Sequence, residues 1–220
     1  MPAYEALANK QVELIRKALA GSLFLAPMSA TLPATLTTGA GADLTALPAD
    51  FDDIGWVTKD DGLTWSRSTE VSEVTSWGSF DPTRRDINAD MTGLNFTAQE
   101  TKRLTLELYN NVDLSAATPT AITGEIAFSQ PTRPSTKYYR AYGIFVDGSG
   151  ADAIYVARLM PRASVTERGD QTWTDGDDAV GYPMTMSASV DSTAGYSVRH
   201  FFGGPGWRSL LVKMDFPALA

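Results

Sequence analysis

The stretch "VGYPMTMSASV", Val180 to Val190, has the clearest pattern in the chain, because apolar and polar residues alternate along it. The apolar residues fill every even position: Val180, Tyr182, Met184, Met186, Ala188 and Val190. Alternation with a period of two places one set of side chains on each face of a β-strand. The same parity returns twice after the turn "DSTAG", in Tyr196, Val198, His200 and Phe202 and then in Leu210, Val212, Met214 and Phe216. The pattern predicts three strands that share one buried face.

Two earlier segments carry apolar residues on both parities. They are "KYYRAYGIFV", residues 137–146, and "AIYVARLM", residues 153–160, joined by "DGSGAD". Strands with apolar residues on both sides are typical of sheets covered on two faces. One face can contact the core, and the other needs a second cover. The chain is therefore predicted to be mainly β.

A segment nearer the N-terminus has the spacing of a β-hairpin. It is "IGWVTKDDGLTWSRSTEVSEVTSWGS", Ile54 to Ser79. Strands are expected at 54–58 and 63–68, with a turn at 59–62 in which Asp-Gly supplies positive φ angles. A further strand is expected over 85–96. Thr97 and Glu100 then fit a capping box that starts a helix near 98–110, with Asn110-Asn111 as its end.

The first 53 residues divide into a helix and an arm. The stripe Ala8, Val12, Ile15 and Leu19 predicts an amphipathic helix over Tyr4 to Leu19. A first strand is expected at Ser22 to Met28, followed by a Pro- and Thr-rich arm with no sustained period. The expected organisation is an N-terminal helix (1–21), a strand and extended arm (22–53), and a β domain (54–220).

Apolar residues along the arm argue against a simple solvated linker. They are Leu32, Leu36, Leu44, Leu47 and Phe51. Because no local core is evident for them, we expect a partner surface, and we expect the arm to become ordered only on assembly. The basic residues before "ALAGSLFLAPMSA" imitate a secretory signal, but the helical segment ahead of it contains Glu5 and Glu13, so a cytosolic, unprocessed chain is expected.

Composition excludes several classes of function. The chain has 220 residues, 43% hydrophobic and 20% charged, which is ordinary for a globular protein. Its net charge of -8 disfavours binding to nucleic acid and to anionic membranes. Without cysteine there is no disulfide, thiolate metal site or Cys nucleophile. No cofactor is expected.

Three motifs resemble chemical sites but lack the features that such sites require. The single histidine, His200, lies on an apolar parity and is expected in a core or interface. The acidic stretch with Asp170, Asp175, Asp177 and Asp178 lacks the spacing of an EF-hand and is expected to be a solvated loop. "FFGGPGW", Phe201 to Trp207, lacks the Lys-Ser or Lys-Thr of a phosphate-binding loop and is expected to be a turn between strands. No catalytic or metal-binding residue is predicted.

The order of these pieces resembles the major tail tube proteins of long, non-contractile-tailed bacteriophages, in particular those that infect actinobacteria. The resemblance covers Ser22 to Phe216, and its firmest points are Gly55-Trp56-Val57, Asp61-Gly62, Trp77-Gly78 and Thr97-Ala98-x-Glu100-Thr101. It implies a barrel-like β-sandwich with a flanking helix, whose subunits close into hexameric rings and stack into a tube.

The resemblance also implies partners and a location. The expected partners are further copies of the chain, the tape measure protein, the tail terminator and the baseplate or distal tail proteins. Double-stranded DNA would pass through an acidic lumen without specific binding, and no membrane is involved. The protein would be assembled in the host cytoplasm and reside in the virion tail. Trp56, Trp65 and Trp77, with the apolar arm residues, are the expected subunit interface. A carbohydrate-binding β-sandwich and a β-rich hydrolase are the alternatives.

Overall fold

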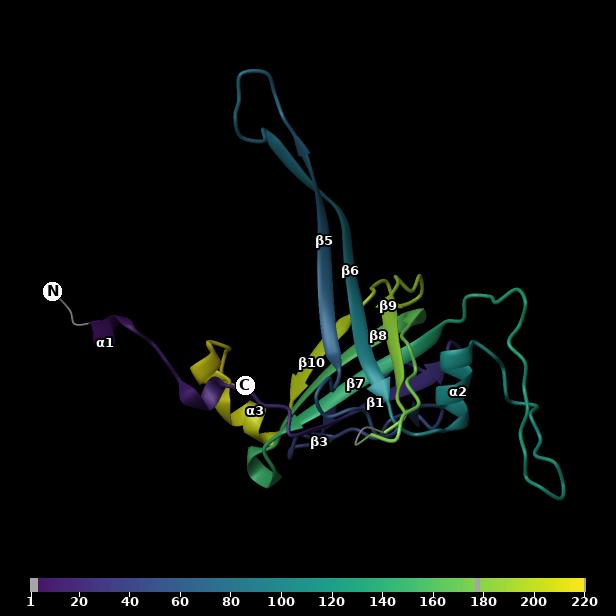
Figure 1. Ribbon diagram of the computed structural model, residues 1–220. Helices are drawn as coiled ribbons and strands as arrows, with labels where there is room; N and C mark the ends of the chain where they lie inside the picture. The colour runs from purple at the N-terminus through teal and green to yellow at the C-terminus, as the bar shows by residue number, and fades with distance from the viewer. Residues whose placement is uncertain (1–3, 177–178, 220) are drawn as a thin grey trace.

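The structure, a computed structural model, describes residues 4–176 and 179–219 and confirms a mainly β chain (Figure 1). Its strands are β1 (Ala20–Pro27), β2 (Thr37–Thr38), β3 (Asp43–Leu44), β4 (Asp52–Asp53), β5 (Thr64–Val74), β6 (Arg84–Ala98), β7 (Tyr139–Asp147), β8 (Ile154–Arg168), β9 (Tyr182–Ala188) and β10 (Arg199–Gly203). The α-helices are α1 (Tyr4–Leu7), α2 (Arg103–Asn110) and α3 (Pro205–Leu210). Short 3-10 helices are η1 (Val12–Leu14), η2 (Gly150–Asp152) and η3 (Val212–Met214).

Eight strands form one antiparallel sheet in the order β4-β1-β7-β8-β9-β6-β5, with β10 as a branch on β8. The branch arises because β8 is long enough to pair with two strands, one after the other, along the same edge. Its residues 155–159 pair with β10, and its residues 163–168 pair with β9. The remaining strands, β2 and β3, form a separate two-stranded sheet. The eight strands thus belong to one hydrogen-bonded sheet, and the predicted barrel-like β-sandwich remains a prediction.

The main core lies between the two halves of this sheet. Leu23 of β1 and Leu94 of β6 belong to the same buried cluster, although β1 and β6 are four places apart in the strand order. The sheet must therefore fold over on itself. Met184 and Met186 of β9 are buried in this core, while Thr185 between them is partly exposed. The alternation in 182–188 correctly predicted which side chains face inward.

A second core covers the opposite face of β7 and β8, as their two-sided sequences predicted. Tyr142 of β7 and Leu159 of β8 pack there with Leu36 and Phe51 of the arm. The arm thus finds its partner surface within its own subunit. The expectation that it lacks a local core is wrong, because strands 137–146 and 153–160 supply that core.

The Asp-Gly turn does not close the expected hairpin. Gly62 has the predicted positive φ of 52°, but Val57 bridges to Ala98 instead of to the strand that follows the turn. That strand extends to Val74 as β5 and pairs with β6, whose range confirms the strand expected at 85–96. The hairpin that this segment forms is therefore β5–β6, with its turn at residues 75–83.

The predicted helix near 98–110 exists, but its start is different. Thr97 still lies in β6, and α2 begins after Lys102 without a side-chain cap. The capping box is wrong because Glu100 is used elsewhere, accepting a hydrogen bond from the backbone N–H of Trp56 at 2.8 Å. The helix does end at Asn111, which adopts a left-handed conformation with φ of 54°.

Both ends of the chain depart from the predicted pattern. The helix expected over 4–19 is reduced to α1 and η1, and its stripe Val12, Ile15 and Leu19 is exposed. In β10 the buried aromatic is Phe201, which packs edge-on against Tyr142, whereas His200 and Phe202 are exposed. The strand expected at 210–216 is instead the end of α3 and η3. "FFGGPGW" leads into α3, because Pro205 occupies the first helical position.

Candidate self-assembly surface

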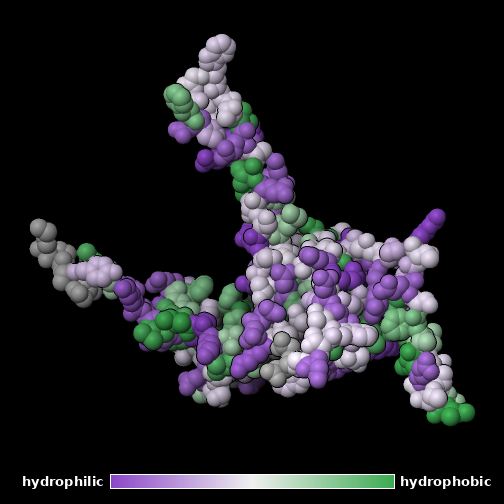
Figure 2. Space-filling view, viewed as in Figure 1, coloured by the Kyte–Doolittle hydropathy of each residue, from purple (hydrophilic) through white to green (hydrophobic). Residues whose placement is uncertain are grey.

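The subunit exposes much more surface than a compact protein of its mass. Its accessible area is 14732 Å², whereas a folded monomer of 23.7 kDa is expected to expose about 9,800 Å². Three projections account for this difference (Figures 1 and 2). The β5–β6 hairpin rises from the body, the N-terminal segment extends to one side, and residues 112–138 form a long loop on the other.

The projecting part of the β5–β6 hairpin is here called the ribbon and comprises 66–74 of β5, 84–92 of β6 and the tip 75–83. Only residues 93–98 of β6 pair with β9, so within the described residues the ribbon has no third strand beside it. A two-stranded hairpin is marginally stable on its own in water. Strand edges without a partner are also ready to pair with another chain.

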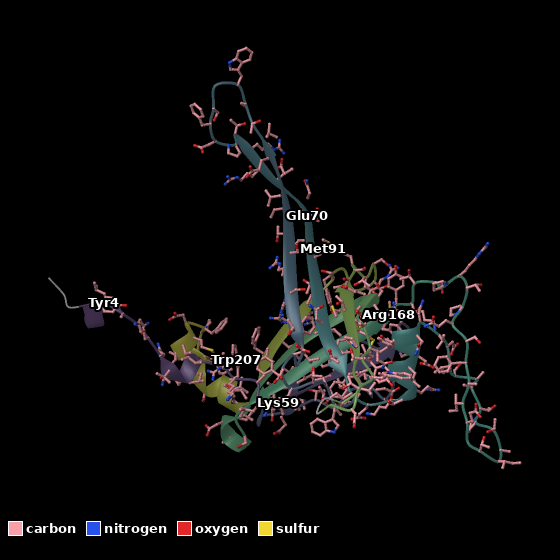
Figure 3. The ribbon with its side chains drawn as sticks, in the orientation of Figure 1. Tyr4, Lys59, Glu70, Met91, Arg168 and Trp207 are labelled. Atoms are coloured by element: carbon pink, nitrogen blue, oxygen red, sulfur yellow. The ribbon has the colours of Figure 1, made fainter. Side chains whose placement is uncertain are left out.

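The two faces of the ribbon differ in chemistry. Val71 and Ile87 face each other across the strands, and the pairs Arg67–Asp90 and Glu73–Arg85 lie on the same face on either side of them. This face, called the odd face after the numbering of β5, continues the face on which Trp65 and Leu94 enter the main core. The opposite, even face carries Ser66, Ser68, Glu70 and Ser72. Its exposed apolar residues do not pair with each other, because Met91 lies opposite Ser68 and Val74 lies opposite Arg84, which bonds Asp86. Glu70 and Met91 mark the middle of the ribbon in Figure 3.

The tip presents two aromatic side chains to solvent. Trp77 and Phe80 are as exposed as in an extended peptide, at 106% and 107%. The turn beneath them is ordered by the backbone bond from Thr83 N to Val74 O at 2.8 Å and by the Ser76–Thr83 hydroxyl pair at 2.7 Å. Exposed aromatic residues on a defined turn are typical anchors of protein interfaces.

The expected interface tryptophans occupy three different environments. Trp77 lies at the exposed tip, and Trp56 is exposed on the body. Trp65 instead packs against the main core, with the Arg158 guanidinium 5.1 Å from its ring centre. The backbone N–H of Trp56 and the ammonium of Lys102, at 2.6 Å, both contact the Glu100 carboxylate. The Lys102 hydrogen bond, followed by the Trp56 N–H, lowers the pKa of Glu100.

The expected interface residues of the arm are mostly covered by their own subunit. Leu36 and Phe51 are buried, and Leu32 and Leu47 pack against the same second core. Leu44, at the end of β3, is exposed. The interface role of these residues remains a prediction, and among the arm residues the geometry favours Leu44.

Several exposed apolar residues were missed from the sequence. On the ribbon they are Val71, Val74, Phe80, Ile87 and Met91, and on the long loop they are Ile122, Ile126 and Phe128. The signal for Phe80 was present, because it lies between Gly78 and Pro82, and turn residues of this kind place a segment on the surface. The sequence pattern does not identify Val71, because the expected strand ends at Ser68 whereas β5 continues to Val74.

The described residues offer no cluster of side chains for a metal ion. They contain no group of three or more His, Asp or Glu side chains close enough to hold a metal ion. His200 lies on the exposed β10, where partial burial, then Arg158 and Arg67, lower its pKa. Asp170 and Asp175 are exposed in the acidic loop, and Asp177 and Asp178 lie outside the described residues. No helix in the described ranges has the length and apolar character needed to cross a membrane.

A family model described as "Phage tail tube protein" matches residues 8–197, which is most of the chain. The chain belongs to this family. Phage tail tube proteins are structural, non-enzymatic components of the virion tail, and the exposed projections of this one suit such a role. The match confirms the resemblance to tail tube proteins inferred from residues 22–216, while the long, non-contractile tail and the actinobacterial type remain predictions. No curated protein matches the chain significantly. The segment after residue 197, which contains β10, α3 and η3, lies outside the matched region of this tail tube protein.

Proposed function

We propose that this tail tube protein assembles into hexameric rings that stack into the tube through which the phage genome passes. The observation that carries the proposal is the area that the subunit leaves exposed, about one and a half times that of a compact monomer, on projections with apolar side chains. Contiguous exposed apolar surface on a soluble protein marks sites of protein association. The excess is large enough for several interfaces of standard size.

The shape of the subunit supports head-to-tail association. The ribbon, the N-terminal segment and the loop 112–138 leave the body in different directions (Figure 1). A projection that contacts a different surface on the next copy forms a heterologous contact, which closes into a ring or continues as a filament. Lateral contacts of the first kind and axial contacts of the second together generate a tube. The subunit interface would include Leu44, Trp56 and Trp77.

We further propose a long, non-contractile tail of the type found in phages of actinobacteria, with the tape measure protein, the tail terminator and the distal tail proteins as neighbours. The folded sheet, in which β1 and β4 join the strands of the β domain of residues 54–220, would act as the unit of the wall and serve as the sandwich of the family. Double-stranded DNA would pass along the lumen without specific binding, because a surplus of eight negative charges on each copy disfavours contact with phosphate.

Negative-stain electron microscopy of the purified protein, together with light scattering over a range of concentrations, tests the proposal. Rings or open tubes with sixfold symmetry are expected. A carbohydrate-binding module would instead remain monomeric and bind glycans, and a hydrolase would turn over substrate. A species that stays monomeric at high concentration, across salt and pH, would exclude assembly by this chain alone.

A further inference from the structure

We propose that the odd face of the ribbon and the two aromatic side chains of its tip form one docking surface for a second copy of this chain. The inference rests on the proposed function, because it names the surface through which the copies join. It assigns the contact to Val71, Ile87, Trp77 and Phe80, and leaves the even face open to solvent.

Continuity of the odd face with the main core is the first support. Near the body, Trp65 and its cross-strand partner Leu94 enter the core of their own subunit. Beyond the Arg67–Asp90 pair, towards the tip, the next apolar pair on this face is Val71 and Ile87, which are 50% and 70% exposed. A directly opposed pair of β-branched residues stabilises a sheet when it is covered. The subunit itself provides no cover at this height, since in the described chain only β5 and β6 reach it.

Charge on the odd face allows a second copy of the same acidic chain to dock there. Each subunit carries a net charge of -8, so the approach of two copies is opposed by repulsion. On the odd face, however, Arg67 bonds Asp90 and Arg85 bonds Glu73, each with a nitrogen-to-oxygen distance of 2.8 Å. The face is thereby neutral as a whole. It is the part of the ribbon that an acidic copy can cover at the smallest electrostatic cost.

The tip supplies the anchors of the contact. Trp77 and Phe80 are not covered by any of the described residues of their own subunit, and both lie on a turn closed by hydrogen bonds. Large aromatic side chains that are rigidly presented dominate binding energy at many interfaces. Trp77 and Phe80 would therefore account for most of the affinity, and the Val71–Ile87 pair would fix which face of the ribbon turns inward.

The even face provides a matched control on the same strand. Ser68 is exposed, lies three residues from Val71, and is directed to the opposite side of the ribbon. Val71→Lys and Ser68→Lys therefore add the same charge to the same projection. Because both positions are on the solvated ribbon, neither substitution alters the two cores, and circular dichroism and the unfolding temperature should confirm this.

Assembly of the purified variants is measured by light scattering and electron microscopy against protein concentration. We expect Val71→Lys and the double variant Trp77→Ala/Phe80→Ala each to raise the concentration needed for half-assembly about tenfold or more. Ser68→Lys should assemble like the wild type. Because the chain has no cysteine, Ile87→Cys and Ser68→Cys can each carry one environment-sensitive dye. Only the dye at 87 should become shielded on assembly.

The outcomes separate the two proposals. If the wild type never assembles, the proposed function fails and this inference fails with it. If the wild type forms tubes and the Val71 and tip variants form them equally well, the docking surface is wrong while the proposed function stands. Assembly blocked equally by Ser68→Lys, with the dye at 68 shielded, would assign the contact to the even face and would also overturn the inference.

Discussion

The indole of Trp65 on β5 lies directly over Gly143 on β7, and a Cβ at position 143 would come within 2.9 Å of the ring atom Cζ2. These strands stand at distant places in the sheet order, separated by β8, β9 and β6. Their contact therefore closes the folded sheet on itself. Glycine at 143 permits the approach, because any side chain there would displace the tryptophan.

Replacing Gly143 by alanine should destabilise the subunit by about 1–3 kcal/mol, because the added methyl group overpacks the contact with Trp65. Urea unfolding followed by circular dichroism measures the loss. In a Trp65→Leu background the same substitution should cost much less, since the two positions are coupled. Equal losses in both backgrounds would show that Gly143 matters for a reason other than this contact.

Truncating the arm residues Leu36 or Phe51 to alanine should destabilise the unassembled subunit by about 2–5 kcal/mol, because both are buried in the second core. Leu44→Ala, at an exposed position on the same arm, serves as the control and should change stability by less than about 0.5 kcal/mol. Limited proteolysis should leave 29–53 intact in the monomer. Rapid cleavage within the arm before assembly would contradict its packing.

Tyr142→Phe should leave the subunit as stable as the wild type or raise its stability by about 1 kcal/mol, because the buried hydroxyl has no hydrogen-bond partner among the described residues. Burial raises the pKa of Tyr142 to about 12, above the value of about 10 in an unfolded chain. The unfolded state therefore loses its proton first, and stability falls as pH rises from about 10 to 12. Unfolding temperatures across this window should fall less steeply for the Phe variant.

Glu100→Gln should lower the unfolding temperature at neutral pH, because the amide loses the charge that holds Lys102. The Lys102 and Trp56 hydrogen bonds lower the pKa of Glu100 in the folded chain. Its contribution is thus complete above the unfolded pKa and is lost as pH falls through the folded value. The difference between wild type and variant should accordingly narrow in acid. A difference that is constant from pH 3 to 7 would show that the carboxylate charge is irrelevant.

Assembled tubes should not retain duplex DNA, even at low salt, because we expect their inner wall to be lined by acidic and small polar side chains. Contacts between lysine or arginine and phosphate would add affinity with every ring and hinder passage. Co-sedimentation of tubes with duplex DNA at about 20 mM salt tests this, where the screening length exceeds about 20 Å. Tight binding, or a map of the tube with a net positive inner wall, would refute the expectation.

The sequence correctly predicted the strands in which the same face, or both faces, stay buried along the whole length. In β9 every even residue faces the main core, so the period of two survives from Tyr182 to Met186. In β7 and β8 both parities are apolar because both faces are covered. Local chemistry also predicted the end of α2 correctly, since asparagine tolerates the left-handed conformation that Asn111 adopts.

The failures occurred where tertiary contacts override local pattern. Thr97 and Glu100 satisfy the sequence rule for a helix start, yet Glu100 contacts Trp56, a residue 44 positions away. At β10 the pairing of Phe201 with Tyr142 reverses the expected parity. The sequence predicted only part of the candidate surface, because it identified Trp77 but not Val71 and Ile87. The exposure of these two residues depends on where β9 stops pairing with β6, and the hydrophobic periodicity of a strand does not indicate where its partner ends.

The position of β8 determines how the subunit would respond to a pull. It is hydrogen-bonded to β7, to β9 and to β10, so it joins the half of the sheet that carries the ribbon to the half that carries the arm. Force applied at the tip would pass through β6 and β9 into the outer third of β8, near the bulge between Val165 and Glu167. A bulge interrupts the ladder and bends a strand. Elastic bending of the sheet would therefore concentrate at this point, and the two halves, packed on a shared core but hydrogen-bonded through one strand, would shift against each other there.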